Sequence, residues 1–324
     1  YLNESYQDYI SKFYSPKTEE LLKTTEFLAY KEGFIKYLKE FITGIQNHVG
    51  QIAETLQSKE IDEETRSAIH EALTAGVEVV FCTGRSFSEM RDILKEFPDM
   101  HYLCSESGAL VLDLQKGETL HREEVSREIA EIMMAAGKRK DLMTCVFSDG
   151  ICCVKKEHML HMDRYQMGQY QKMYEKTCNP MEENVLERLL KEERPVEKIN
   201  LYHTSPDERL ETRKWLEQQK IQAELVDSEI SSLECSPLGV SKASGLKSRC
   251  ARLGLGMEQV VMVGDADNDI EAMKAAGMAV AMGNANAHVK AVCDLEVADN
   301  NHQGCAQAIR MVCGEEAYNG QVLG

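Results

Sequence analysis

Runs of apolar residues followed by helical spacing recur along most of this chain. The clearest run is Val260–Val263, which indicates a buried strand, followed by Ile270–Ala276, which has the apolar spacing of a helix and closes at Gly277. The same alternation predicts the elements of an earlier stretch: helices over 61–75 and 88–96, and strands over 77–82, 102–104 and 109–112. Strands that alternate with helices are typical of a parallel sheet.

From about Asp113 the pattern changes. Residues 143–147 and 151–154 flank Ser148-Asp149-Gly150, and they predict a β-hairpin because Asp-Gly favours a tight turn. A polar stretch rich in Met and Tyr runs over 158–184. Further elements are expected as follows: strands over 198–202, 221–226 and 232–235, and a helix over 207–219. At Pro237 the first pattern returns, with a helix over 242–253, so the sequence predicts a mixed α+β insert between two parallel-sheet halves.

The N-terminal segment has a different repeat. After a helix expected from Ser15-Pro16 to about Tyr30, apolar residues alternate in steps of three and four: Ile35, Leu38, Ile42, Ile45, Val49, Ile52 and Leu56. The repeat fits one amphipathic helix that packs on its own domain, or a coiled coil that pairs two chains through residues 31–58. Gly44 and Gly50 weaken such a helix by about 1 kcal/mol each, which favours the first interpretation because short coiled coils are marginal.

Composition and charge limit the function. A length of 324 residues suggests about two domains. The net charge of −17 argues against a general nucleic-acid binder and against adhesion to anionic membranes. The 11 cysteines show no zinc-type spacing and indicate reduced, mostly buried thiols. With neither a signal peptide nor an apolar run near 18 residues, the sequence predicts a cytoplasmic protein that does not cross a membrane.

Candidate chemistry gathers behind the Val260–Val263 strand. Gly264 ends this strand, and Asp265, Asp267, Asn268 and Asp269 follow within five positions. The acids therefore lie on a turn at the carboxyl end of a buried strand, where open α/β sheets bind ligands. Hard oxygen ligands of this kind suit Mg²⁺. The alternative is an acidic helix N-cap, but one cap needs only one such residue.

Three blocks together resemble a known family. They are Thr83-Gly84-Arg85, Gly239-Val240-Ser241-Lys242 and Gly264–Asp269. Their order is similar to that of the haloacid dehalogenase (HAD) superfamily, and the long insert and Gly277–Ala285 look like its Cof-type branch with a class II cap. The resemblance implies an α/β fold: a Rossmann-like parallel sheet core with an inserted α+β cap domain and an N-terminal helical segment. The domains would be 1–59 (helical segment), 60–112 (first core part), 113–236 (cap) and 237–324 (second core part).

The resemblance also implies a Mg²⁺-dependent phosphatase and gives each residue a role. Thr83 would hydrogen-bond the transferring phosphoryl group, and Gly84 and Arg85 would bind the substrate next to it. Lys242 would neutralise the charge of the phosphoryl group and of the nucleophile. Asp265 and Asp269 would serve the metal, and Asn268 would help to position the phosphate. Such roles suit phosphoryl transfer, which depends on positioning and charge stabilisation. A plainer interpretation makes Thr83 a strand-end cap and Lys242 a solvated residue, although a cation in the first turn opposes the helix dipole.

The family's nucleophile motif, Asp-x-Asp-Gly-Thr, is not found. Alignment on Thr55-Leu56 places Gln51 and Ala53 at the two acidic positions, and neither side chain can form an aspartyl-phosphate or donate the proton. Three accounts stay open. The catalytic strand is lost; or a foreign segment of about 57 residues replaces it; or residues 41–52 hold an unusual strand. A substitute carboxylate would have to come from a nearby residue such as Glu54, Glu60 or Asp62.

Two functions follow from these alternatives. The first is a Mg²⁺-dependent phosphatase that acts on a small phosphorylated metabolite such as a sugar phosphate, with the insert as a lid over the substrate. The second is a catalytically inactive protein that binds a phosphate ligand, or a partner through its N-terminal helices.

Overall fold

The computed structural model describes residues 61–228 and 230–313. The chain divides into two compact units, residues 1–60 and 61–324, and every described residue belongs to the second. The helix expected over 15–30 and the heptad repeat from Ile35 to Leu56 lie outside the described residues. The pairing of chains through residues 31–58 therefore stays a prediction.

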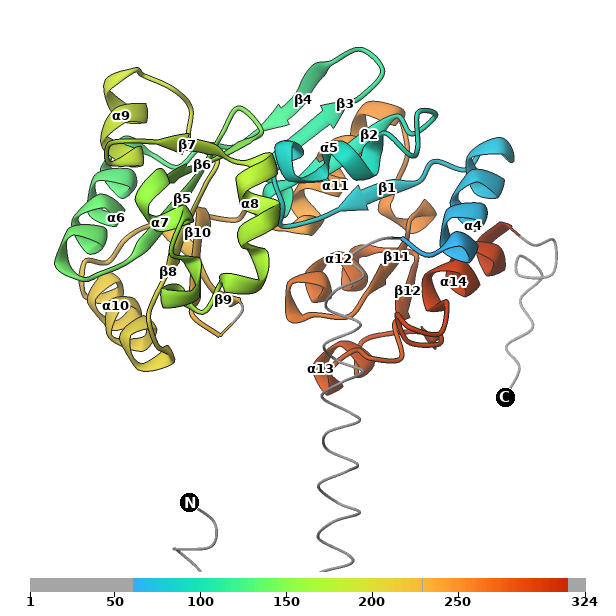
Figure 1. Ribbon diagram of the computed structural model, residues 1–324. Coiled ribbons are helices and arrows are strands. Elements are labelled where there is room, and N and C mark those ends of the chain that lie inside the picture. The colour runs from blue at the N-terminus through green and yellow to red at the C-terminus, as the bar shows by residue number, and fades with distance from the viewer. Residues whose placement is uncertain (1–60, 229, 314–324) are drawn as a thin grey trace, which may run out of the picture. The chain divides into compact units, whose positions relative to one another are not determined.

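The first core sheet contains four strands in the order β1-β2-β3-β4 (Figure 1). They are β1 (Val80–Cys82), β2 (Tyr102–Ser105), β3 (Leu110–Asp113) and β4 (Glu118–Arg122). The expected parallel pairing holds for β1 and β2 but is wrong for β3 and β4, which are antiparallel to their neighbours. The reason is a tight turn, η1 (Glu106–Gly108), that reverses the chain before a helix can form. The predicted boundary at residue 112 falls inside this hairpin.

The second core sheet is parallel and has the order β11-β12-β13. Its strands are β11 (Val261–Gly264), β12 (Met278–Ala281) and β13 (Leu295–Glu296). Within residues 61–228 and 230–313, no strand pairs with the second edge of β1 or of β11, so the core consists of two separate sheets.

The described core also contains helices and short turns. They are α4 (Glu63–Thr74), α5 (Phe87–Leu94), α11 (Lys242–Leu253), α12 (Ile270–Ala275), α13 (Ala287–Lys290) and α14 (Gly304–Cys313), with the short turns η4 (Met257–Gln259) and η5 (Asp267–Asp269). α4 lies beside α14, and Arg310 forms ion pairs with Glu64 and Glu71. One apolar cluster joins Val80 of β1 to Met262 of β11, so both sheets share a core.

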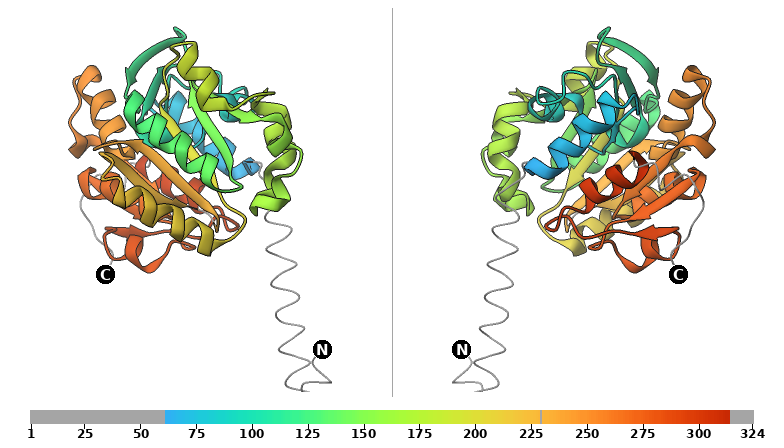
Figure 2. Two further views of the ribbon diagram at one scale, coloured as in Figure 1. Left: turned by 90° about the vertical axis from the view of Figure 1, so that its left-hand side faces the viewer. Right: turned by 90° about the vertical axis from the view of Figure 1, so that its right-hand side faces the viewer.

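The insert folds around a six-stranded sheet with the order β7-β6-β5-β8-β10-β9. Its strands are β5 (Met143–Ser148), β6 (Ile151–Lys155), β7 (Asn179–Met181), β8 (Lys198–Tyr202), β9 (Ala223–Ser228) and β10 (Ser232–Pro237). Alternate residues of β5 face opposite sides, since Val146 joins one apolar cluster and Cys145 and Phe147 join the other. Helices cover both faces (Figures 1 and 2). The predicted hairpin over Asp149-Gly150 is confirmed.

The two faces carry different helices. The first face is covered by α6 (Arg127–Arg139), α9 (Val185–Lys191) and α10 (Pro206–Gln218). The second is covered by short helices that fill the Met- and Tyr-rich stretch: α7 (Lys156–Met159), η2 (Met162–Tyr165), η3 (Gly168–Tyr170) and α8 (Gln171–Thr177). Met162, Tyr165 and Tyr174 are almost completely buried there. This stretch is therefore part of the cap's core although its sequence is polar on average.

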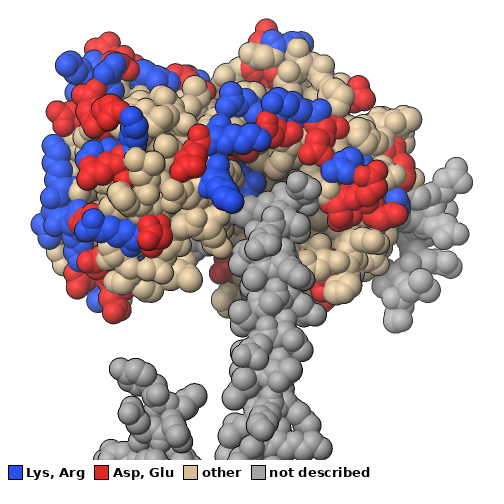
Figure 3. All heavy atoms as spheres, viewed as in Figure 1, with Lys and Arg blue, Asp and Glu red and all other residues tan. Residues whose placement is uncertain are grey.

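Surface charge and thiols agree with the composition. Basic and acidic side chains of the described residues lie next to one another over the face shown in Figure 3. All 11 cysteines are described and are free thiols, and none is exposed. Among the described helices, none combines the length and the apolar character that crossing a membrane requires.

Candidate functional site

The acidic turn after β11 is held together by its own last residue. Asp269 is buried, and its Oδ2 accepts hydrogen bonds from the backbone N–H groups of Asp265 and Ala266, both at 3.1 Å. Gly264 is required here because a Cβ atom would lie 2.6 Å from the Cβ of Asp269. Asp265, Asp267 and Asn268 remain exposed. Asp269 therefore fixes the turn, and its neighbours present their side chains to solvent.

Lys242 meets this turn from the first position of α11. Its Nζ lies 2.5 Å from Asp269 Oδ1 and 3.4 Å from Asn268 Oδ1, and Lys242 is 8% exposed. Ser241 caps α11 through a reciprocal hydrogen-bond pair with Ser244, and this fixes where the helix begins. The carboxylate of Asp269 offsets the unfavourable position of a cation at a helix N-terminus. Lys242 is therefore buried beside the acidic turn and is not a solvated surface residue.

The turn after β1 is built mainly from backbone contacts. Thr83 N–H donates to Cys104 O, and Thr83 O accepts from Ser107 N–H, both at 2.9 Å. Arg85 N–H donates to Thr83 Oγ1 at 3.1 Å, and Arg85 O accepts from Glu106 N–H at 3.0 Å. Thr83 thus caps the strand end, as the plainer interpretation expects, and among the described residues its hydroxyl accepts a hydrogen bond but donates none.

Gly108 joins the two turns. With a φ of 102°, it lies so close to the start of α11 that a Cβ atom would be 2.1 Å from Ser241 O. Gly245, one turn further along α11, would place a Cβ 2.8 Å from Gly108 Cα. The loop that hydrogen-bonds Thr83 therefore rests directly on the residue before Lys242, and the structure brings these two predicted residues into one region.

The carboxylates available at the acidic turn determine whether Mg²⁺ could bind there. No group of three His, Cys, Asp or Glu side chains suitable for a metal occurs within the described part of the chain. Both oxygens of Asp269 already accept hydrogen bonds, which leaves Asp265 as the exposed carboxylate of the predicted pair. Mg²⁺ is commonly held by one or two carboxylates, with water and substrate phosphate oxygens completing its shell. Asp265 fits such a site, and Asp269 fits a supporting role.

The structure adds residues that the sequence did not single out. Asn284 Nδ2 donates to Asp265 Oδ2 at 3.0 Å, and Asn286 Nδ2 donates to Asp267 Oδ1 at 2.9 Å. Asn284 lies in Gly277–Ala285, a block that contributed to the family resemblance but was given no role in the site. Asp62, considered as a substitute nucleophile, is instead the N-cap of α4 and accepts from Thr65 N–H at 2.8 Å. Glu54 and Glu60 lie outside the described residues.

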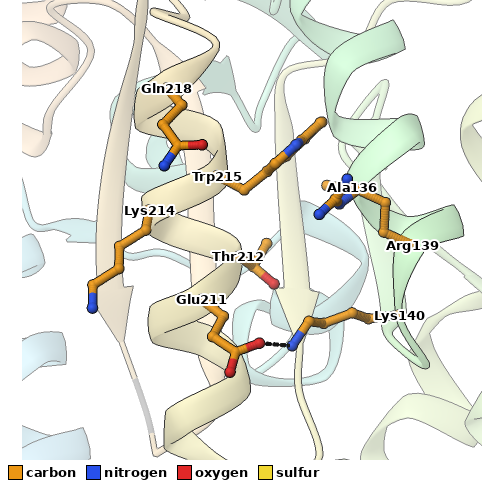
Figure 4. Close-up of a pocket in the computed structure, with 8 residues that line it drawn as sticks. All are labelled: Ala136, Arg139, Lys140, Glu211, Thr212, Lys214, Trp215 and Gln218. Atoms are coloured by element: carbon orange, nitrogen blue, oxygen red, sulfur yellow. Dashed lines mark hydrogen bonds and ion pairs between the residues drawn. The ribbon is translucent and has the colours of Figure 1, made fainter.

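A hollow of about 270 Å³ lies apart from this region. It sits between α6 and α10 of the cap and is lined by Ala136, Arg139, Lys140, Glu211, Thr212, Lys214, Trp215 and Gln218 (Figure 4). Lys140 and Glu211 form an ion pair across it, and Arg139 stacks over Trp215. None of the predicted site residues lines this hollow.

Comparison with known families decides the assignment. The family model described as haloacid dehalogenase-like hydrolase matches residues 52–309. The chain belongs to this family. The match begins one residue after Gln51, the position that the resemblance gives to the nucleophile. A second model, described only as a protein of unknown function, matches residues 1–81.

Curated relatives of this family member differ in length. An endoribonuclease YBEY from Arabidopsis thaliana is 27% identical over 78% of the chain, but the chain spans only 44% of that protein. The Bacillus subtilis 5-amino-6-(5-phospho-D-ribitylamino)uracil phosphatase YcsE is 28% identical, with 77% of this chain and 88% of the relative covered. An HMP-PP phosphatase from Cronobacter sakazakii is 28% identical over 70% of the chain and 79% of its own length.

Solved structures confirm the fold. A haloacid dehalogenase-like hydrolase from Bacteroides thetaiotaomicron superposes with a TM-score of 0.67 at 21% identity, covering 78% of this chain and 93% of that one. A sugar phosphatase of HAD subclass IIB gives a TM-score of 0.66 at 18% identity, covering 80% and 94%. The predicted α/β core with a cap is therefore confirmed, and the family match confirms the resemblance to the HAD superfamily.

Proposed function

We propose that the chain is a Mg²⁺-dependent phosphatase of small phosphorylated metabolites that acts in the cytoplasm. The observation that carries the proposal is the buried Lys242–Asp269 pair, which holds an amino group beside exposed Asp265 and Asn268 at the carboxyl end of β11. In this proposal Lys242 and the Thr83 hydroxyl bind the phosphoryl oxygens, while Gly84 and Arg85 flank the bound substrate. Asp265 would hold Mg²⁺, which supplies positive charge to the phosphate.

A second function is favoured by one specific observation. No described strand lies between β1 and β11, and the segment that should carry the nucleophile has Gln51 in its place. A chain without that carboxylate can still bind a phosphate through Lys242 and Thr83. The alternative is thus a phosphate-binding protein without turnover, whose N-terminal residues 31–58 could pair with a partner.

One experiment separates the two. Phosphate release from a panel of sugar phosphates and an aryl phosphate is measured with and without Mg²⁺, for the full chain and for Asp265→Ala. A phosphatase should show turnover that depends on both Mg²⁺ and Asp265. If turnover stays at the level of the Asp265→Ala variant while inorganic phosphate still binds by calorimetry, the chain is a binder.

A further inference from the structure

Lys198 is a charged residue in the interior of the protein. It begins β8 of the cap, and it is completely buried. Its amino group forms an ion pair with Glu234 on the neighbouring strand β10. Charged side chains are almost never fully buried unless they are paired, so the position of this lysine calls for a function that an apolar side chain could not perform.

Two further contacts of Lys198 cross from the cap to the core. Nζ donates to Gly84 O at 3.2 Å and to Ser107 Oγ at 3.1 Å. Gly84 is the middle residue of the Thr83-Gly84-Arg85 turn, and Ser107 N–H is the donor to Thr83 O. One amino group from the cap therefore hydrogen-bonds a backbone carbonyl of the turn after β1 and a side-chain hydroxyl of the loop that holds this turn.

The loop that receives Lys198 has an unfavourable backbone. Glu106 and Ser107 have φ values of 57° and 61°, in the left-handed region that non-glycine residues seldom adopt. Each such residue stores about 1 kcal/mol or more and persists only where its surroundings fix it. The two hydrogen bonds to backbone partners, Ser107 N–H to Thr83 O and Glu106 N–H to Arg85 O, depend on this path. The contact from Lys198 to Ser107 Oγ helps to hold it.

We propose that Lys198 is a positioning residue by which the cap orders the Thr83-Gly84-Arg85 turn. The inference deepens the proposed function, because that turn is part of the phosphate site. Lys198 is not one of the phosphate-binding residues of the proposed function, and it forms no hydrogen bond with Lys242. It acts by fixing Gly84 O and Ser107 Oγ, so the turn takes its binding geometry only with the cap seated. Linkage makes the effect reciprocal: a phosphate that orders the turn must also stabilise the cap contact.

Hydrogen exchange of the loop amides tests the first half of this inference. Lys198→Met removes the donor while it keeps most of the side-chain volume. We expect exchange at the Glu106 and Ser107 amides to become about tenfold faster or more, because hydrogen bonds to charged groups are the stronger ones. Lys156→Met is the matched control, since Lys156 is an exposed cap lysine paired with Glu182. Equal exchange in the two variants overturns the proposal.

Two further variants separate positioning from general stability. Ser107→Ala removes one acceptor without leaving a buried charge unpaired, so it decides the question if Lys198→Met does not fold. It should speed up the same amides to a smaller degree and shift the Arg85 amide resonance. Lys198→Arg keeps a long donor and should restore most of the protection. A purely structural role predicts uniform loss of protection over the whole cap in each variant, and that result overturns the proposal.

Binding of inorganic phosphate tests the second half. Phosphate added to the wild type should slow exchange in β8, and this response should disappear in Lys198→Met. If the wild type binds no phosphate, the proposed function fails, but the loop exchange still decides the role of Lys198. If phosphate binds and β8 does not respond, the coupling between cap and turn is disproved.

Discussion

At the scale of single residues, Asp269 makes more hydrogen bonds than Lys242 does, so the two members of this pair should differ in their effect on stability. Asp269 accepts from Lys242 and from two backbone N–H groups, whereas Lys242 has Asp269 and a longer contact to Asn268. Removal of one member of a buried pair costs about 3 kcal/mol or more. We expect Asp269→Ala to lower the free energy of unfolding, measured in urea, by this amount, and Lys242→Met to lower it clearly less. Both variants should abolish phosphate binding. A larger loss for Lys242→Met would contradict the roles assigned to the turn.

Glu106 gives a prediction for pH. It is completely buried, and neither carboxyl oxygen has a hydrogen-bond partner among the described residues. Burial, and then the nearby Glu197, raise the pKa of Glu106 well above its usual value of 4.5. The folded state therefore keeps a proton that the unfolded chain releases, so stability falls as pH rises above 4.5, by at most about 1.4 kcal/mol per pH unit.

Glu106→Gln should remove this loss, because Gln is neutral and has nearly the same shape. The variant should be more stable than the wild type at about pH 8 and no more stable at about pH 4, where the wild-type carboxyl is protonated in both states. Urea midpoints at the two pH values measure the difference. A gain of the same size at both would show that charge on Glu106 is not its cause.

At the scale of elements, local signals account for what the sequence predicted well. The helix expected over 242–253 is observed with the same bounds, because Ser241 caps its start and Gly254 ends it at a φ of 70°. The strand 198–202 is also reproduced. The antiparallel pairing of β3 with β2 follows from the η1 turn, and the short helices over 156–177 depend on the burial of Met162 and Tyr165. Local spacing encodes neither feature.

The candidate site shows the same limit. Asp265 to Asp269 could be predicted because they are neighbours in sequence on one strand end. The contact of Lys198 with Gly84 could not, since 114 positions separate the two residues. One sequence feature could have indicated it: two charged residues, Glu197 and Lys198, stand at the start of a strand.

Gly245 in α11 tests how closely this helix must approach the core. Alanine in a helix interior is favoured over glycine by about 1 kcal/mol. At Gly245, however, a Cβ would lie 2.7 Å from Cys104 Sγ and 2.8 Å from Gly108 Cα, and overpacking of this kind costs about 1–3 kcal/mol. Gly245→Ala should therefore lower the thermal midpoint and weaken phosphate binding. Gly137→Ala in α6 is the control, because its nearest neighbour is the Thr144 hydroxyl at 3.3 Å; equal effects would contradict the argument.

At the scale of the whole molecule, β1 and β11 each have one edge that no described strand pairs with. In a parallel strand, alternate residues direct their backbone groups to opposite neighbours. Thr83 N–H donates to Cys104 O in β2, and Val260 O accepts from Met278 N–H at the start of β12. By this alternation, the N–H groups of Cys82 in β1 and Val263 in β11 point away from the paired strands. No described strand receives them. Both residues are only partly buried.

Hydrogen exchange at this edge separates an unusual strand from the two accounts in which the nucleophile strand is lost or replaced. If that strand is lost or replaced, the amides of Cys82 and Val263 should exchange much faster than those of Phe81 and Met262, which face paired strands. That outcome would favour the phosphate-binding protein over the phosphatase. Equal protection of all four amides would mean that a strand from residues outside the described part completes the sheet. Magnesium-dependent turnover should then accompany it, since a completed sheet restores the position from which a carboxylate could attack the phosphoryl group.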